Sequence, residues 1–328
     1  MSKIYLTGGR ERSTIFRQLE EWQSTDQACI IELDTEKNQS RACVEYISPK
    51  EACADELPAI LFKSASVRGD TIYACTSTEV LIYRLPSFEL LHYISLPCFN
   101  DLHHVCPSSR GTLLVVVTGL DLVVEITTAG ELVQEWSVLG EDTWARFSRE
   151  IDYRKVPTTK PHQSHPNHVF ELDGEVWATR LHQRDVVCLT APGSRIDIAV
   201  QRPHDGYLFA GKIYFTTVDG HIVIASQETK QVEQVIDLNA MTQSEQILGW
   251  CRGVLPLDER RMWVGFTRVR PTKFVENVAW IKHGTYLHRP SYIALYDVER
   301  KKCEQKIEIE PHGIGVLFSL LSIPQTIE

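Results

Sequence analysis

The chain has 328 residues, of which 43% are hydrophobic and 9% aromatic, and it carries a formal net charge of −9. This length and apolar content are sufficient for one closed domain with a sizeable core. The acidic balance argues against nucleic acid as a partner, because nucleic-acid-binding proteins favour basic faces that release counterions from phosphate. No apolar run approaches the ~18 residues of a membrane-spanning helix, so we expect no membrane insertion.

Nine cysteines are present, and they form no C-x-x-C pair. Their odd number and spacing indicate neither a zinc ribbon nor a disulfide framework. The first residues lead directly into an apolar strand without a cleavable signal segment. Reduced, packed thiols are typical of a cytoplasmic protein, and we expect that location.

A repeated pattern runs along the chain, in which a short apolar strand ends at a threonine. The six threonines are Thr7, Thr76, Thr118, Thr179, Thr216 and Thr267. The closest of them lie about 40 residues apart, which is the length of a four-stranded β-propeller blade. The sequence therefore predicts an all-β fold, a six-bladed β-propeller formed by residues 1–328 as a single domain.

The blades can be assigned in chain order from the apolar runs around each threonine. Five of them are predicted near residues 56–97, 101–138, 165–200, 202–238 and 249–309. The sixth is split: its innermost strand runs from Gly315 to Leu320, and its other strands are Ile4 to Thr7, Cys29 to Leu33 and Ala42 to Ile47. A sheet that joins both chain ends closes the ring and removes an open edge.

Three segments are longer than a minimal blade requires, at residues 8–27, 140–164 and 268–290. Propeller topology places all three on the rim where the innermost strands begin. Apolar residues at helical spacing, including Trp22 and Trp144, predict short amphipathic helices in the first two. Asp142 or Thr143 is a suitable cap for the second helix. The helices either pack on the rim or cover a pocket.

Polar residues mark the predicted starts of the innermost strands. These starts align as Phe62-Lys63, His103-His104, Asn167-His168, His204-Asp205, Arg252-Gly253 and His312-Gly313, with a register open by one residue. Histidine appears in four of the six pairs, although the chain has only 12 histidines. Because imidazole binds metals and exchanges protons near neutral pH, the alignment indicates a functional site at the axis. The alternative is a polar channel whose residues only satisfy one another's hydrogen bonds.

A divalent metal ion is one candidate ligand of this axial site. The predicted metal ligands are His104, His168, Asp205 and His312. Such imidazole and carboxylate donors favour zinc, iron or manganese over calcium. We interpret His162 and His165, which precede the third predicted blade, as loop hydrogen-bonding groups rather than ligands. The predicted acid and base residues are His104, His168 and His204.

Basic residues near the axis and on the rim indicate an anionic substrate. Arg252 beside a metal cation is unfavourable unless an anion lies between them. The third insertion adds basic residues in large excess over acidic ones. The predicted substrate-binding residues are Lys63, His103, Asn167, Arg180, His182 and Arg252. The chain lacks the P-loop and the G-x-G-x-x-G pattern, so no nucleotide cofactor is expected.

In its six repeats, split last blade and polar axial positions, the chain resembles six-bladed propellers of the gluconolactonase and strictosidine-synthase-like group. That resemblance is architectural and includes no diagnostic motif. It implies a central ion held by Glu, Asn and Asp; Asn167 and Asp205 match such positions, whereas the axial histidines depart from them. The mixture of axial His, Asn and Arg is also similar to arylsulfate sulfotransferases, which use a nucleophilic histidine.

These features together predict an enzyme that acts on a small anionic metabolite in a histidine-rich axial pocket. Hydrolase, lyase and cyclase chemistry all fit, with or without a metal ion. The alternative is a non-catalytic propeller that binds a protein or peptide through an aromatic and basic rim, including Trp22, Trp144 and Phe147.

Overall fold

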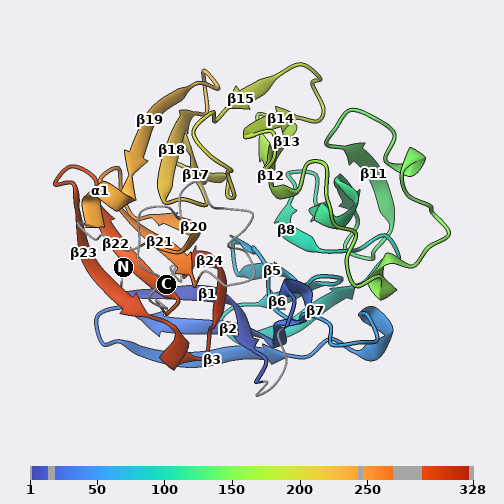
Figure 1. Cartoon of the computed structure of the whole chain (residues 1–328), viewed down its shortest axis with the longest axis horizontal. Coiled ribbons are helices and arrows are strands. Elements are labelled where there is room, and N and C mark those ends of the chain that lie inside the picture. The colour runs from blue at the N-terminus through green and yellow to red at the C-terminus, as the bar shows by residue number, and fades with distance from the viewer. Residues whose placement is uncertain (1, 14–18, 243–246, 269–289, 325–328) are drawn as a thin grey trace.

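The computed structural model describes residues 2–13, 19–242, 247–268 and 290–324. Six four-stranded antiparallel sheets are arranged as a ring, with one edge strand of each sheet nearest the axis (Figure 1). The prediction of a six-bladed β-propeller is confirmed. Within the described ranges, no helix is long and apolar enough to cross a membrane.

Five blades each come from one continuous stretch of chain, as predicted. The first contains β4 (Ser66–Arg68), β5 (Thr71–Cys75), β6 (Val80–Arg84) and β7 (Glu89–Ile94). The second contains β8 (Leu102–Pro107), β9 (Leu113–Val117), β10 (Leu122–Ile126) and β11 (Leu132–Ser137). The third contains β12 (Pro166–Leu172), β13 (Glu175–Arg180), β14 (Asp185–Cys188) and β15 (Arg195–Asp197). The fourth contains β16 (Tyr207–Phe209), β17 (Lys212–Thr216), β18 (His221–Ser226) and β19 (Val232–Asp237), and the fifth β20 (Trp250–Pro256), β21 (Arg261–Thr267), β22 (Tyr292–Asp297) and β23 (Lys302–Glu308).

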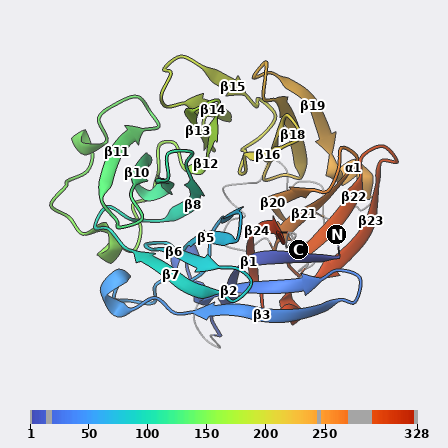
Figure 2. The same ribbon diagram turned by 180° about the vertical axis from the view of Figure 1, so that it is seen from behind.

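The sixth blade closes the ring with strands from both ends of the chain. Its order is β24 (Val316–Ser322), β1 (Lys3–Glu11), β2 (Thr25–Asp34) and β3 (Gln39–Tyr46). Thr7 of β1 pairs with Ser319 of β24, and Ile4 pairs with Ser322. The two termini consequently lie on the same blade, as the reverse view shows (Figure 2). This arrangement confirms the predicted closure.

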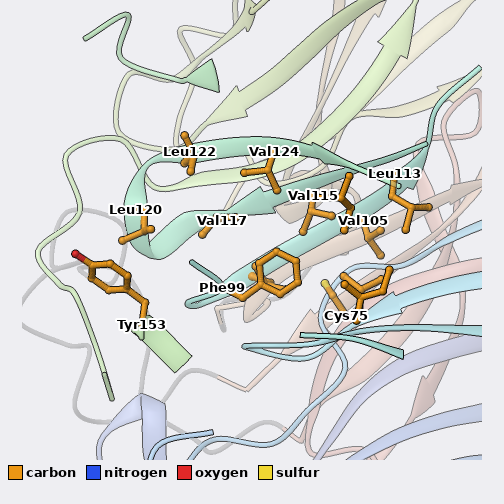
Figure 3. Packing of buried hydrophobic residues seen from close by; sticks show 14 of the residues in the cluster. Cys75, Phe99, Val105, Leu113, Val115, Val117, Leu120, Leu122, Val124 and Tyr153 are labelled. Carbon is orange, nitrogen blue, oxygen red and sulfur yellow. The ribbon is translucent and has the colours of Figure 1, made fainter. Parts of the chain in front are cut away.

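Neighbouring blades pack through β-branched and aromatic side chains. Strand β9 is buried along its whole length, and β10 is buried on both faces. Val105 and Val115 of the second blade lie in one apolar cluster with Phe99 and with Cys75 of the first blade (Figure 3). Continuous Val and Leu runs therefore form strands because both of their faces contact other blades.

The repeated threonine has a structural role that explains its recurrence. Four of the six hydroxyls donate to a backbone carbonyl at the inner strand of a neighbouring blade: Thr7 to Lys63, Thr118 to Pro166, Thr179 to Asp205 and Thr267 to Leu317, at 2.6–3.1 Å. Three of the acceptors, Lys63, Pro166 and Asp205, lie at or beside the predicted axial positions, and Leu317 precedes Phe318 in β24. The ties between blades therefore also position the backbone of the axial residues.

In the described residues of the first two insertions, short 3-10 turns occur where amphipathic α-helices were predicted. These turns are η1 (Glu21–Gln23), η4 (Thr143–Ala145) and η5 (Tyr153–Lys155). In the first insertion, β1 and β2 continue pairing as far as Glu11 and Thr25, and the helix predicted from Ile15, Phe16, Leu19 and Trp22 falls in part on residues outside the described ones. Asp142 caps η4, accepting the Trp144 N–H at 3.0 Å. Residues 14–18 and 269–289 of the insertions lie outside the described residues.

Candidate functional site

All six blades contribute a side chain to one cluster at the axis, which we call the axial site. Its members are Lys63, Asp101, His103, His165, His204, Arg252 and Phe318. Each lies in an innermost strand or just before one, and Phe318 lies within the innermost strand β24. Segments that are far apart in the sequence therefore meet because the ring brings their strand starts together.

The Phe318 ring lies in the middle of this cluster. Arg252 Cζ is 4.5 Å and Lys63 Nζ is 5.2 Å from the ring centroid. The rings of His103 and His204 lie 6.0 Å and 5.9 Å from it. The aromatic face stabilises two cations that approach the same point. These two cations share the site with the carboxylates of Asp101 and Asp205, and they are the donors that an anionic ligand would use.

Lys63 is buried and pairs with Asp101, with 2.7 Å between Nζ and Oδ1. Burial alone would raise the pKa of Asp101, but the positive charge of Lys63 outweighs it and holds that pKa well below its usual range. His103 Nδ1 lies 2.8 Å from the backbone carbonyl of Asp101 and donates to it. Burial and the Lys63 charge hold the pKa of His103 far below its ordinary value. His103 is therefore neutral and Asp101 ionised at neutral pH.

His204 and Asp205 form a second buried pair. His204 Nδ1 lies 3.4 Å from Asp205 Oδ1, and Asp205 Oδ2 accepts from Thr216 Oγ1 and, at 2.9 Å, from Gly253 N. Burial raises the pKa of Asp205, but the bonds from His204, Thr216 and Gly253 lower it overall. His204 Nε2 is buried and has no hydrogen-bond partner among the described residues. The pair thus orients an imidazole whose second nitrogen is not used by the fold.

A loop before β12 carries His162 and His165 to the axial site. The carboxylate of Asp121 accepts three successive backbone N–H groups of this loop, from Gln163, Ser164 and His165, at 2.8–3.0 Å. Asp121 is itself buried and pairs with Arg146. The loop is therefore held as a unit by a residue that lies before β10.

Two histidines of this loop belong to a cluster of possible metal ligands. The Nδ1 atoms of His162 and His165 are 2.8 Å apart. With Asp101 they form a group whose ligand atoms all lie within 4.8 Å of one another, the one such group of His, Cys, Asp and Glu in the described part of the chain. The predicted ligand set of His104, His168, Asp205 and His312 does not form such a group there.

His104 and His168 form a separate stacked pair, with ring centroids 3.6 Å apart. His104 Nε2 lies 2.9 Å from Ser66 Oγ, and Nδ1 accepts the Val169 N–H at 3.3 Å. Burial lowers the pKa of His104 to about 3 and holds that of His168 well below its usual value. Both ring nitrogens of His104 are thus occupied in connecting blades, which does not suit the predicted catalytic role.

His312 does not lie at the axis, contrary to the alignment of strand starts. It ends the 3-10 turn η7 (Glu310–His312), and its ring nitrogens lie 2.9 Å from Ser40 Oγ and 3.0 Å from Asn38 Oδ1. The sixth inner strand begins later, at Val316, so Phe318 supplies the axial side chain. Because this turn precedes β24, the strand starts later in the sequence than the alignment predicted.

The other predicted substrate-binding residues have different surroundings. Asn167 is buried and donates to the Pro203 carbonyl at 2.9 Å, while its Oδ1 has no partner among the described residues. Arg180 pairs with Asp185 within its own blade. His182 is exposed, and its ring lies 6.1 Å from that of His165. Arg180 is therefore a structural residue, and His182 lies at the edge of the axial site.

The rim aromatic residues make contacts within the molecule. Trp144 Nε1 donates to Glu135 at 3.1 Å, and Arg149 stacks on the same indole at 4.1 Å. Phe147 packs edge-to-face on Tyr153. These side chains fasten the second insertion to the outer part of the second blade.

Sequence reasoning missed three members of the axial site: Asp101, Phe318, and His165, for which it predicted only a hydrogen-bonding role in the loop. Asp101 stands two residues before His103, so the D-x-H spacing at a strand start was a usable signal. Phe318 carried no such signal, because an aromatic residue in an apolar strand is ordinary.

No protein-family model matches the chain, and no curated protein sequence matches it. Among solved structures, it is similar to a protein of unknown function from Bacteroides caccae, with a TM-score of 0.62, 13% identity and coverage of 99% of this chain and 100% of that one. It is also similar to a chain of a nidogen/laminin complex, with a TM-score of 0.57, 9% identity and 97% coverage of both. Virginiamycin B lyase from Staphylococcus aureus aligns at a TM-score of 0.46 and 14% identity over 72% of this chain and 69% of that one. At such identities the comparisons show the fold alone.

Proposed function

We propose that the chain is an enzyme that acts on a small anionic metabolite at the axial site, with His204 as the general base. The observation that supports this proposal most directly is the buried Nε2 of His204, which has no partner among the described residues. Buried polar groups are nearly always hydrogen-bonded, so an exception in an oriented His–Asp pair points to a reacting ligand.

The His204–Asp205 pair has the arrangement that general-base catalysis requires. The Asp205 carboxylate lies beside Nδ1, which directs the lone pair of the neutral ring to Nε2. Burial lowers the pKa of His204 despite the opposing effect of Asp205, so the ring is neutral and able to accept a proton at neutral pH. When Nε2 takes a proton from the substrate or from water, Asp205 stabilises the imidazolium that forms.

Lys63 and Arg252 supply the groups for binding an anion. Both cations lie against the Phe318 ring, which also contacts the rings of His103 and His204. A carboxylate, phosphate or sulfate between them would gain charge-assisted hydrogen bonds in surroundings of low polarity. Such a substrate would present an acidic C–H or a water molecule to His204, which accounts for lyase, cyclase or hydrolase chemistry.

A substrate panel with a matched pair of variants tests the proposal. The panel consists of carboxylates with acidic α-protons, lactones, and phosphate and sulfate esters. We expect His204→Gln to lower kcat/KM by about 10²–10⁴ on the active compound, the usual contribution of a general base. His312→Ala, a histidine away from the axis, should keep wild-type activity. Circular dichroism checks that both variants fold.

Two outcomes would overturn this proposal. One is wild-type turnover by a folded His204→Gln protein. The other is the absence of turnover on the whole panel together with the absence of sulfate and phosphate binding by calorimetry. A protein- or peptide-binding propeller would instead respond to Trp144→Ala, although the contacts of Trp144 with Glu135 and Arg149 lend that alternative less support.

A further inference from the structure

We propose that Asp101, His162 and His165 bind a divalent transition-metal ion at the axial site. This ligand set differs from the set that the alignment of inner strands suggested, since it combines one strand-start carboxylate with two imidazoles of an inserted loop. Only the statement about the substrate class rests on the proposed function. Metal binding itself can be measured without any substrate.

The spacing of the donor atoms matches a metal site that needs little rearrangement. Metal–nitrogen bonds of about 2.0–2.1 Å place neighbouring ligand atoms roughly 3 Å apart. The Nδ1 atoms of His162 and His165 are 2.8 Å apart, and an oxygen of Asp101 lies within 4.8 Å of both. Two ring nitrogens that face each other at this distance need a proton or a cation between them, since two lone pairs would repel.

The hydrogen bonds around His162 leave its Nδ1 available as a ligand. Thr159 Oγ1 donates to the Gly119 carbonyl, so towards His162 Nε2, at 3.3 Å, the hydroxyl acts as the acceptor. His162 therefore carries its proton on Nε2 and directs a lone pair from Nδ1 towards His165. Without a metal ion, His165 Nδ1–H donates to that lone pair. When a metal ion binds, it takes the place of this proton, and His165 keeps a neutral ring by carrying its proton on Nε2.

The surroundings hold all three ligands before any ion binds. Asp121 fixes the loop through three backbone N–H groups, including that of His165 itself. Lys63 binds Oδ1 of Asp101 at 2.7 Å and so holds the carboxylate in place. Such supporting contacts to metal ligands commonly account for a large part of metal affinity.

Two imidazoles and one carboxylate suit zinc, iron(II), manganese or cobalt, and they leave coordination positions open. The ion would add positive charge to a site that already holds Lys63 and Arg252, and its ligand Asp101 would balance part of that charge. An anionic substrate would neutralise this charge and could coordinate the open positions. The metal thus sharpens the proposed substrate class to compounds with a carboxylate, phosphate or sulfate group that can bind a metal ion.

The direct experiment is metal analysis of protein purified without chelator, followed by chelation and titration with Co²⁺. We expect about one equivalent of a first-row metal and a visible Co²⁺ absorption band that saturates at one equivalent. Asp101→Asn, His162→Gln and His165→Gln should each weaken Co²⁺ binding by more than about 100-fold, beyond the usual effect of an outer-shell change. His312→Ala is the matched control and should bind as the wild type does.

The proposal is overturned if the wild-type protein holds less than about a tenth of an equivalent and shows no Co²⁺ band, or if all three ligand variants keep wild-type affinity. The wild-type spectrum tests metal binding even if a variant fails to fold. Failure of the metal site is distinguishable from failure of the general base. His204→Gln should retain the metal and lose turnover. If the wild-type protein binds no metal but His204→Gln still lowers turnover, the metal site alone is refuted.

Discussion

Two regions of this propeller bury polar groups, and they differ in whether those groups have hydrogen-bond partners. In the first blade, the carboxylate of Glu79 is fully buried and accepts hydrogen bonds from four hydroxyl groups, those of Tyr46, Ser48, Thr76 and Tyr93. Burial and Glu79 raise the pKa of Tyr93 to about 12, which keeps this phenol a donor. Every oxygen in this group, which we call the Glu79 cluster, has a partner.

The axial site and the strand starts around it contrast with the Glu79 cluster. Buried atoms without a hydrogen-bond partner among the described residues gather there, namely Ser64 Oγ, Ser164 Oγ, Asn167 Oδ1, His168 Nδ1 and His204 Nε2. An unmet buried group costs about 1–3 kcal/mol. The same fold that satisfies Glu79 leaves these atoms without partners among the described residues, which agrees with the binding role proposed for the axial site.

The largest effect is expected at the Glu79 cluster. Glu79→Leu would leave four hydroxyls without their acceptor, two of them on the buried residues Ser48 and Thr76. At about 1–3 kcal/mol for each unmet buried group, the free energy of unfolding should fall by about 2–6 kcal/mol. Urea denaturation measures the change. Metal binding by the folded fraction should stay at the wild-type value. Loss of metal affinity in the folded protein would show that the two regions are not separate.

A pH titration tests the buried histidines beside the axial site. The folded-state pKa values of His104 and His168 lie below the unfolded value of about 6.5, so only the unfolded chain takes up these protons as the pH falls. Their stabilisation is complete above about pH 6.5 and is lost at lower pH, by up to about 2.7 kcal/mol per pH unit for the pair. Urea denaturation between pH 7 and pH 4.5, with chelator present, follows this loss.

His168→Phe is the matched variant for this titration, since phenylalanine keeps the stacking on His104 but cannot take up a proton. The pH dependence of unfolding should become shallower by about one proton. If the pH dependence of the free energy of unfolding did not change, His168 would have to take up its proton in the folded state as it does in the unfolded state.

The smallest effect is expected from a single tie between blades. Thr118→Val removes the buried hydrogen bond to the Pro166 carbonyl and should cost about 1–2 kcal/mol. Thr71→Val is the control, because the Thr71 hydroxyl donates to exposed Asp70, and its change should stay within about 0.5 kcal/mol. Equal effects in the two variants would contradict the role assigned to the repeated threonine.

Much of this architecture could be predicted from local patterns. Strand alternation and a repeat of about 40 residues indicate the blades, because the pleat and the turn act over a few residues. The positions of Lys63, His103, His204 and Arg252 at strand starts follow from that repeat. The closing blade could also be predicted, because the apolar runs at the two ends of the chain together supply the four strands of one sheet.

The candidate metal site depends on contacts that no local pattern contains. His162 and His165 reach Asp101 because Asp121, more than 40 positions earlier, binds the backbone of their loop. His312 leaves the axis and Phe318 enters it because one 3-10 turn delays the start of β24. Periodicity places residues along a strand, whereas the convergence of loop atoms requires long-range hydrogen bonds that form only when the ring has closed.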